Sequence, residues 1–422
     1  MANTSYSTVF FPNPQSVDWR RAGKDPLSLA LINARNRTLQ LLASLEQQLG
    51  PELRVPELSE INPPMWELGH IGWFQEYWIG RNLQRHLGLA CDPTAARLPS
   101  LQAHADRWWN SSDVPHHTRW GLDLPDVNQT RTFLLDTLES TLDLLAKAPQ
   151  DDDGLYFFRL CLFHEDMHAE AFLMLMQAMG LAQDLGLPSP RPVRESLLIP
   201  AGLWRLGSDP GLGFAYDNEM PALEVAVPEF EIDAQVVNWA QFIEFIDDGG
   251  YDRQELWHPV GWDWLQAKGL QEGRRAPRYV DQIGVARLGG EGAVIQQYFG
   301  QARRMAGLQP AMHLSWWEAD AWCRWAGRRL PTEVEWEMAA HQAARRGFHW
   351  GDVWEWTAST FRGLPGFEPH PYRDYSRPWF DTHKAVRGAS LVTSPRMRHP
   401  KYRNFYEPHR DDVFIGFRSC AM

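Results

Sequence analysis

Residues 154–179 read GLYFFRLCLFHEDMHAEAFLMLMQAM, and Gly180 follows them. The segment has helical length, and Leu160, Phe163, Met167 and Phe172 indicate that much of it is buried. His164 and His168 are four residues apart, so both imidazoles project from one face of the helix, one turn apart. Two histidines in a core need a partner, and a metal ion provides one; a pair of hydrogen-bonded core histidines is the alternative.

The string His164-Glu-Asp-Met-His168 also matches the H-E-x-x-H motif of zinc proteases. In those enzymes the glutamate is the general base and a third ligand follows downstream. The motif is short, and it leaves a zinc hydrolase as an alternative. The carboxylates of Glu165, Asp166 and Glu170 either orient the imidazoles or form a solvated face.

A third histidine, His70, lies in MWELGHIGWFQEYW (65–78) with Gly69 and Gly72 beside it. A glycine inside a helix costs about 1 kcal/mol relative to alanine. The two glycines therefore indicate a close approach, either of another helix or of a ligand. Three neutral imidazoles on one ion leave coordination positions open and suit Zn²⁺ and Fe²⁺ equally, so spacing does not choose between them.

The first half of the chain is predicted to be helical. Four amphipathic segments, 27–49, 64–89, 127–147 and 154–179, indicate a four-helix bundle, in whose core metal sites are common. After a proline-rich stretch, short apolar runs at 223–227 and 230–232 and helical stretches at 239–247 and 316–327 predict an α+β domain. We expect a bundle over 1–186, a linker over 187–196 and a second domain over 197–422.

The composition excludes several classes of protein. The 422 residues carry a net charge of −12, which does not suit a nucleic-acid-binding protein. No run of about 18 apolar residues predicts a membrane span, and the first 14 residues lack the features of a signal peptide. The separated cysteines Cys91, Cys161, Cys323 and Cys420 suit a reducing compartment, so we expect a cytoplasmic protein. The 21 tryptophans indicate an aromatic core or a pocket for a cationic ligand.

The chain carries the phrases of a known enzyme family over nearly its whole length. The early His70 and the later H-x-x-x-H resemble a DinB-type helical bundle. The second half resembles the formylglycine-generating-enzyme domain, a variant of the C-type lectin fold, through IPAGLWRLGS (199–208), HLSWWEA (313–319), RLPTEVEW (329–336), GDVWEWT (351–357), RGAS (387–390) and GFR (416–418). This pairing resembles the ergothioneine sulfoxide synthases (EgtB-like) and the related selenoneine synthases (SenA-like).

The resemblance implies a mononuclear non-haem Fe(II) site with His70, His164 and His168 as ligands. It also implies O₂ as co-substrate, hercynine (Nα-trimethylhistidine) as one substrate, and a new bond at the imidazole C2 carbon. Aromatic faces attract quaternary cations, which gives the tryptophans a role toward the trimethylammonium group. Formylglycine-generating enzymes hold copper with paired cysteines; we find no such pair here.

Departures from the family pattern concern the sulfur or selenium donor. The loop RNFYEPHR (403–410) resembles R-N-W-D-x-P-x-R of synthases that use γ-glutamylcysteine: Asn404 and Arg410 match, while Phe405 and Tyr406 replace Trp and Asp. In VPHHTR (114–119), which resembles the donor-binding R-x-x-R, Arg119 matches and His116 replaces the first arginine. Losing one cation and one anion removes two charge-assisted contacts, so we predict a less charged donor. A selenosugar fits, and the alternative is neutral drift within synthases that use γ-glutamylcysteine or cysteine.

The synthases also use a tyrosine as proton donor, a role that suits a phenol within hydrogen-bond reach. We expect it in PGFEPHPYRDY (365–375), at Tyr372 or Tyr375, unless Phe367 occupies its position. A non-catalytic binding module built on the lectin-like fold is the remaining alternative.

Overall fold

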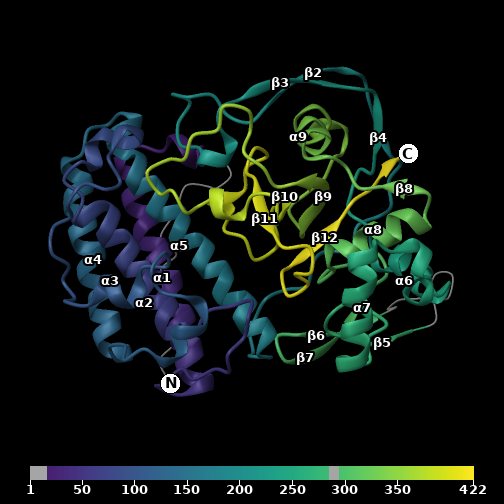
Figure 1. The fold of residues 1–422 in the computed structure, drawn as a ribbon, viewed down its shortest axis with the longest axis horizontal. Helices are drawn as coiled ribbons and strands as arrows, with labels where there is room; N and C mark the ends of the chain where they lie inside the picture. Colours follow the sequence, from purple (N-terminus) through teal and green to yellow (C-terminus); the bar gives the residue numbers. More distant parts are fainter. Residues whose placement is uncertain (1–16, 285–293) are drawn as a thin grey trace, which may run out of the picture.

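The computed structural model describes residues 17–284 and 294–422, so the first 14 residues, on which the signal-peptide prediction rests, lie outside the described residues. The first half is helical (Figure 1). Helix α1 packs on α5 and α4, and α2 packs on α4 and α5. No helix in the described part is long and apolar enough to cross a membrane. The helices are α1 (Lys24–Leu49), α2 (Pro64–Gln75), α3 (Ala105–Trp109), α4 (Val127–Lys147) and α5 (Asp152–Ala178).

Local sequence signals set the ends of these helices. Asp126 and Gln129 form a reciprocal capping box at the start of α4, and the Asp151 side chain accepts a hydrogen bond from the Gly154 N–H at the start of α5. The predicted helix over 127–147 is confirmed.

The single helix predicted over 64–89 is wrong. Helix α2 ends at Gln75, a π-helical segment η3 (Glu76–Gly80) follows, and the 3₁₀ segment η4 (Arg85–Ala90) contains Gly88 at φ 51°. A side chain at Gly88 would clash with Asp153 at the start of α5. The chain turns there because it passes close to another helix, which helical periodicity does not reveal.

In the described part of the second half, residues 187–284 and 294–422, the chain forms four small sheets and four α-helices. One sheet has the order β1-β4-β13-β8 and another β11-β10-β9-β12, in which only the β9–β12 pair is parallel; β2 pairs with β3, and β6 lies between β5 and β7. The strands are β1 (Leu197–Ile199), β2 (Gly202–Leu206), β3 (Leu223–Val227), β4 (Phe230–Ile232), β5 (Val280–Ile283), β6 (Val294–Tyr298), β7 (Gln301–Met305), β8 (Arg328–Arg329), β9 (Trp354–Thr360), β10 (Lys384–Gly388), β11 (Asn404–Tyr406), β12 (Ile415–Phe417) and β13 (Cys420–Ala421).

The helices of this half are α6 (Trp239–Asp247), α7 (Pro259–Glu272), α8 (Trp316–Trp325) and α9 (Glu333–Gln342). The predicted strands at 223–227 and 230–232 and the helix at 239–247 are confirmed. Helices α7 and α9 were not predicted. Each begins with a recognisable signal, Pro259 at the first helical position and a Thr332–Glu335 capping box.

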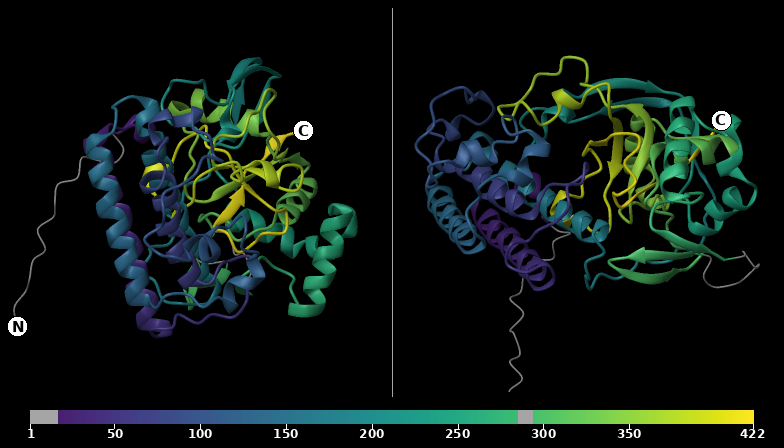
Figure 2. Two further views of the ribbon diagram at one scale, coloured as in Figure 1. Left: turned by 60° about the vertical axis from the view of Figure 1, so that its left-hand side comes forward. Right: turned by 60° about the horizontal axis from the view of Figure 1, so that its bottom comes forward.

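Helix α5 joins the two halves, which lie side by side (Figures 1 and 2). Arg396 donates two hydrogen bonds to the carboxylate of Asp166, at 2.9 and 2.7 Å. Glu170 accepts from the Trp354 indole at 2.7 Å and from the Ser390 hydroxyl at 2.9 Å. The helix that carries two of the three histidines is therefore anchored to the second half by buried polar contacts.

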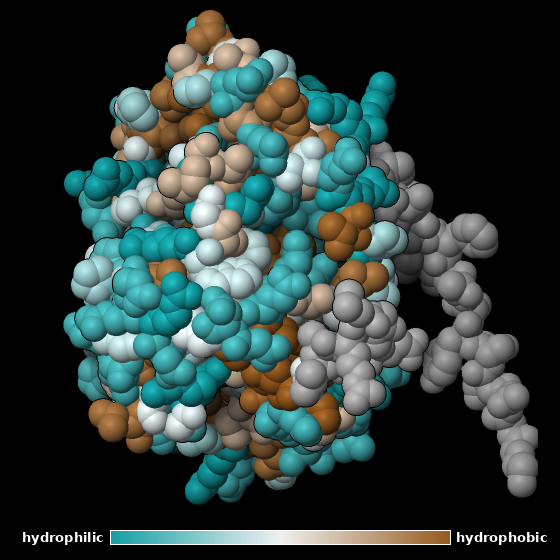
Figure 3. All heavy atoms as spheres, turned by 90° about the vertical axis from the view of Figure 1, so that its right-hand side faces the viewer, coloured by the Kyte–Doolittle hydropathy of each residue, from teal (hydrophilic) through white to brown (hydrophobic). Residues whose placement is uncertain are grey.

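Most of the large aromatic side chains lie inside the molecule. The indoles of Trp66, Trp109, Trp239, Trp336, Trp354 and Trp356 are almost completely buried. On the outer face of the second half, hydrophilic residues are interspersed with small hydrophobic groups (Figure 3). Core packing therefore accounts for much of the tryptophan content, and the remaining question is which rings border the histidines.

Candidate metal centre

The three predicted histidines meet between α2 and α5. The candidate ligand atoms of His70, His164 and His168 all lie within 4.8 Å of one another. His70 and His164 are buried, and His168 is partly buried. The Nε2 atoms of His164 and His168 are 3.1 Å apart. Residues separated by almost a hundred positions thus form one compact group of imidazoles.

Hydrogen bonds fix the tautomers of two of these rings. The Nδ1 of His70 lies 2.7 Å from the Trp109 carbonyl oxygen, and the Nδ1 of His168 lies 2.5 Å from Glu67 Oε1. Both partners accept hydrogen bonds, so each Nδ1 carries the hydrogen and each Nε2 keeps a lone pair. Neutral imidazoles oriented through their second nitrogen are the usual ligands of Zn²⁺ and Fe²⁺, and this donor set fits such an ion.

Burial keeps His70 and His164 neutral. It lowers the pKa of His70 to about 3, with a further contribution from His168, and it lowers the pKa of His164 well below its usual range. Burial opposes ionisation of Glu67, but attraction to His168 and the hydrogen bond from it hold the pKa of that carboxyl below its ordinary value. At neutral pH His70 and His164 therefore offer unprotonated nitrogens close to the Glu67 carboxylate, as metal binding requires.

The glycines beside His70 serve helix packing. A Cβ at Gly69 would clash with the Trp109 indole, and one at Gly72 would lie 2.7 Å from the Phe133 ring. The close approach that the glycines predicted is thus that of neighbouring segments. It also brings the Trp109 carbonyl to the Nδ1 of His70.

Aromatic rings surround the imidazoles. Phe74 stacks on His164 with ring centroids 3.5 Å apart, and Trp66 stacks on His70 at 4.7 Å with an interplanar angle of 11°. Tyr372 meets Phe74 edge to face at 4.9 Å and lies 6.5 Å from His164 between ring centroids. Burial raises the pKa of Tyr372 to about 12, so its phenol stays protonated at neutral pH.

Tyr375 belongs to a second tyrosine group on the same side of α5. Its hydroxyl lies 3.1 Å from that of Tyr402, and the two oxygens lie 3.8 and 3.5 Å from the Met167 sulfur. Burial raises the pKa of both phenols well above the usual range. Tyr402 was missed by the sequence interpretation, although it directly precedes the loop at 403–410. Phe367 packs on Phe380, with ring centroids 5.0 Å apart.

The late loop forms β11 and pairs with β10. Phe405 stacks on Phe361 at 4.2 Å and meets Tyr375 edge to face at 5.9 Å. The Asn404 amide donates to the Tyr406 hydroxyl at 3.4 Å. Arg410 donates to both carboxylate oxygens of Asp412, at 2.6 and 2.7 Å, and its guanidinium lies 5.3 Å from the centre of the Tyr406 ring. The charge of Arg410 is therefore already compensated within the loop.

The segment at 114–119 lies against the start of α2. His116 Nε2 lies 3.2 Å from the Ile61 carbonyl oxygen. Arg119 donates to the Asn62 side-chain oxygen at 2.6 Å and to the Val114 carbonyl at 3.0 Å.

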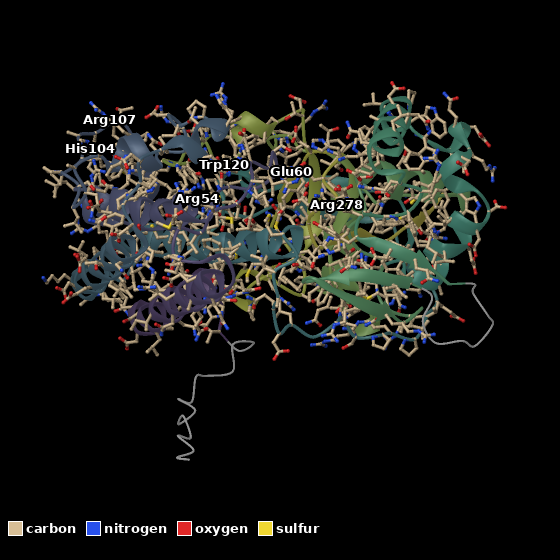
Figure 4. All side chains as sticks on the ribbon, turned by 90° about the horizontal axis from the view of Figure 1, so that it is seen from below. Arg54, Glu60, His104, Arg107, Trp120 and Arg278 are labelled. Carbon is tan, nitrogen blue, oxygen red and sulfur yellow. The ribbon has the colours of Figure 1, made fainter. Side chains whose placement is uncertain are left out.

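Arg119 also lines a groove of about 660 Å³, together with Arg54 and Trp120. In Figure 4, Arg54, Trp120, Glu60 and Arg278 follow one another along one face, from the helical half toward the second half. The outer side of the 114–119 segment thus borders an open surface groove.

Comparison with known proteins assigns the family. Residues 183–352 match the sulfatase-modifying factor enzyme 1-like domain. The hercynine oxygenase of Mycolicibacterium smegmatis is 32% identical, over 94% of this chain and 98% of the relative. The chain belongs to the hercynine oxygenase family. The hercynine oxygenase of Mycobacterium tuberculosis is 31% identical over 93% of the chain, and the formylglycine-generating enzyme of Streptomyces coelicolor is 32% identical over 39% of it.

In the present chain, Glu165 does not face the histidines as a general base. Its carboxylate accepts from Arg35 Nε at 2.8 Å, from Arg35 Nη2 at 3.2 Å and from the Thr38 hydroxyl at 2.8 Å. Asp166 and Glu170 are also buried, and both accept hydrogen bonds from side chains of the second half. The three carboxylates therefore stabilise the fold, and they form neither a solvated face nor a set of groups that orient the imidazoles. Since Glu165 is bound to Arg35, no general base remains for the zinc-hydrolase alternative.

All four cysteines of the present chain are buried, and none of them forms a disulfide. Burial raises the pKa of Cys323 well above its usual range and that of Cys420 to about 12. Both therefore remain thiols at neutral pH, whereas a thiolate is the form that binds a metal.

Proposed function

We propose that this chain is an Fe(II)- and O₂-dependent enzyme that joins a donor to the imidazole C2 of hercynine, and that the donor is a selenosugar. The convergence of three imidazoles, two with fixed lone pairs, supports a metal held by His70, His164 and His168. The similarity to hercynine oxygenases over nearly the whole chain supports hercynine as a substrate. Bound Fe(II) would supply the one-electron chemistry that O₂ needs to act as an oxidant.

The residues around the metal have distinct proposed roles. The rings of Phe74 and Tyr372 lie beside His164 and provide an aromatic surface that suits a quaternary ammonium group. Tyr372 and Tyr375 hold phenolic protons at neutral pH, and a phenol within reach of the substrate can donate one. Tyr402 is hydrogen-bonded to Tyr375 through their hydroxyls, 3.1 Å apart, and would hold the Tyr375 phenol in place. Asn404, Phe405 and Tyr406 form the donor side of the site.

The charges near the site favour a donor with few charges. Arg410 is neutralised by Asp412, and Arg119 is already engaged by Asn62 and backbone carbonyls. His116 contacts the Ile61 carbonyl. A zwitterionic peptide would have to compete for these cations, whereas a sugar hydroxyl can bond to Tyr406 or Asn404 without displacing an ion pair. Ergothioneine-type coupling of γ-glutamylcysteine or cysteine to hercynine is the second candidate, because the similar proteins are named hercynine oxygenases.

The experiment is a donor competition. The protein is loaded anaerobically with Fe(II), mixed with hercynine and an equal concentration of selenosugar, γ-glutamylcysteine or cysteine, and exposed to O₂. We expect the selenosugar to give the coupled product, identified by its mass and selenium isotope pattern, and His164→Ala to give none. Coupling only with a thiol would overturn the donor assignment, and no coupled product with any donor would overturn the function.

A further inference from the structure

One arginine connects to two of the three histidines by separate routes. The first route is a chain of hydrogen bonds. Arg119 Nη1 donates to Asn62 Oδ1 at 2.6 Å, Asn62 Nδ2 donates to Glu67 Oε2 at 2.6 Å, and Glu67 Oε1 accepts from His168 Nδ1 at 2.5 Å. Every link joins a donor to an acceptor, so the chain runs unbroken from the guanidinium to the imidazole.

The chain has a fixed direction. Arginine has only donors and an ionised carboxylate only acceptors, so the amide of Asn62 must turn its oxygen to Arg119 and its nitrogen to Glu67. Glu67 is 3% exposed, and each of its oxygens is used by one partner. A buried carboxylate that lost one of these donors would be left undersolvated and would move. The orientation of His168 therefore depends on Asn62 and on the arginine that holds Asn62.

The second route is a stack of planar groups. The Trp66 indole is 1% exposed, and the Arg119 guanidinium lies 3.8 Å from its ring centre. The His70 ring stacks on the same indole at 4.7 Å, nearly parallel. The indole N–H donates to the Trp108 carbonyl at 2.6 Å, which fixes the plane of the ring. Arg119 thus contacts the indole on which the His70 ring stacks.

We propose that Arg119 is a positioning residue of the metal centre, which holds His168 through Asn62 and Glu67 and His70 through Trp66. Its Nη1 bonds to Asn62, and its Nε and Nη2 bond to the backbone carbonyls of Val114 and Ser111, so it is not the arm that binds the carboxylate of a donor substrate. The inference rests on the proposed function in one respect, that a metal binds the three histidines. It adds Asn62, Glu67 and Trp66 as groups that act through those histidines.

The test uses Co²⁺ as the probe ion, because it accepts imidazole ligands and its visible absorption reports the geometry of its ligands. Glu67→Gln keeps the size of the side chain but replaces one accepting oxygen by an N–H₂ donor, which must face the donor of Asn62 or of His168. Asn62→Ala breaks the hydrogen-bond route alone, Trp66→Leu breaks the stacking route alone, and Arg119→Met breaks both. Loss of a group that orients a metal-bound histidine typically weakens metal binding about 10- to 100-fold.

Two control variants remove similar groups that do not contact the histidines. Glu76 is 5% exposed and accepts from Ser100 and from the Leu101 N–H, so Glu76→Gln is matched to Glu67→Gln in chemistry and burial. Arg274 donates to the Asp411 carboxylate at 2.7 Å and lies 5.4 Å from the Trp264 ring centre, with neither partner bound to a histidine, so Arg274→Met matches Arg119→Met. We expect both controls to bind Co²⁺ within about twofold of the unaltered protein and to keep its absorption spectrum.

The expected result is about 10-fold weaker Co²⁺ binding for Asn62→Ala and about 100-fold for Arg119→Met, each with shifted absorption bands. If Asn62→Ala and Arg119→Met bind Co²⁺ like the unaltered protein, or if the controls lose as much affinity, the proposal is wrong. If Arg119→Met does not fold, Asn62→Ala and Trp66→Leu test the two routes separately, and normal Co²⁺ binding by both variants would overturn the proposal. If the unaltered protein binds Co²⁺ no better than His164→Ala, the metal site and the proposed function fail instead.

Discussion

Replacing Glu165 should reveal a structural charge rather than a catalytic one. The Arg35 side chain is completely buried, and that of Glu165 is 2% exposed. Glu165→Ala removes the acceptor of two Arg35 donors and of the Thr38 hydroxyl, and it leaves a buried guanidinium without its counter-charge. Breaking one side of such a pair costs about 3–5 kcal/mol. Arg35 keeps its hydrogen bonds to Gln75 and to the Leu134 carbonyl, so we expect a loss near 3 kcal/mol, at the lower end of that range.

A double-mutant cycle measures this term. Arg35→Met removes the stranded cation, so adding Glu165→Ala to it should cost only about 1 kcal/mol, which gives a coupling energy of about 2 kcal/mol between the two side chains. The measurement is urea unfolding followed by far-UV circular dichroism. The matched control is the pair Glu46–Arg131, which also joins two bundle helices, at 2.6 Å, but has side chains 25% and 35% exposed. Its cycle should give about 0.5 kcal/mol or less. A Glu165–Arg35 coupling no larger than the control would refute the structural role.

Three further outcomes follow from the packing, the buried histidines and the tyrosines. Gly69→Ala places a methyl group against the Trp109 indole and should lower the free energy of unfolding by about 1–3 kcal/mol. Gly80→Ala is the control, because its Cβ would meet nothing closer than 3.7 Å, and it should not lower that free energy. Equal losses for the two variants in denaturant titrations would contradict the packing argument. His313 is fully buried, and burial lowers its pKa to about 4. Between about pH 4 and 6.5 the unfolded chain therefore binds one more proton than the folded chain, so the folded state loses stability on acidification. His313→Asn removes this group. The difference in unfolding free energy between the variant and the unaltered protein should then change by about 1.4 kcal/mol per pH unit across that window. A difference that does not depend on pH would show that the histidine is already protonated in the folded protein. Tyr375→Phe should lower kcat for hercynine coupling by about 100-fold if its phenol donates a proton. Tyr298→Phe is the control, because it loses only a hydrogen bond to the Gly186 carbonyl, and it should leave kcat unchanged. Similar rates for Tyr375→Phe and the unaltered protein would show that Tyr375 is not the proton donor.

Features that depend on neighbouring residues in the chain could be predicted from the sequence. The spacing of His164 and His168 fixed their common helix face because an α-helix repeats every 3.6 residues. The helix at 127–147 and the strands at 223–227 and 230–232 followed from local periodicity and capping. Helices α7 and α9 escaped that treatment because their burial patterns are not clearly amphipathic, although their first residues carried start signals.

The partners of the site residues were decided only by the tertiary structure. Glu165 meets Arg35, which is 130 positions away, and Glu67 meets His168, which is 101 positions away. Sequence spacing placed Glu165 beside the histidines and gave no sign of Glu67 or Tyr402, because a carboxylate or a phenol is oriented by whichever donor the packed helices bring to it. The sequence alone determined that two histidines share one helix face and that His70 lies on another helix. The packing of α1, α2 and α5 determined which carboxylate holds His168, since hydrogen bonds between separate helices depend on distances in space and not on distances along the chain.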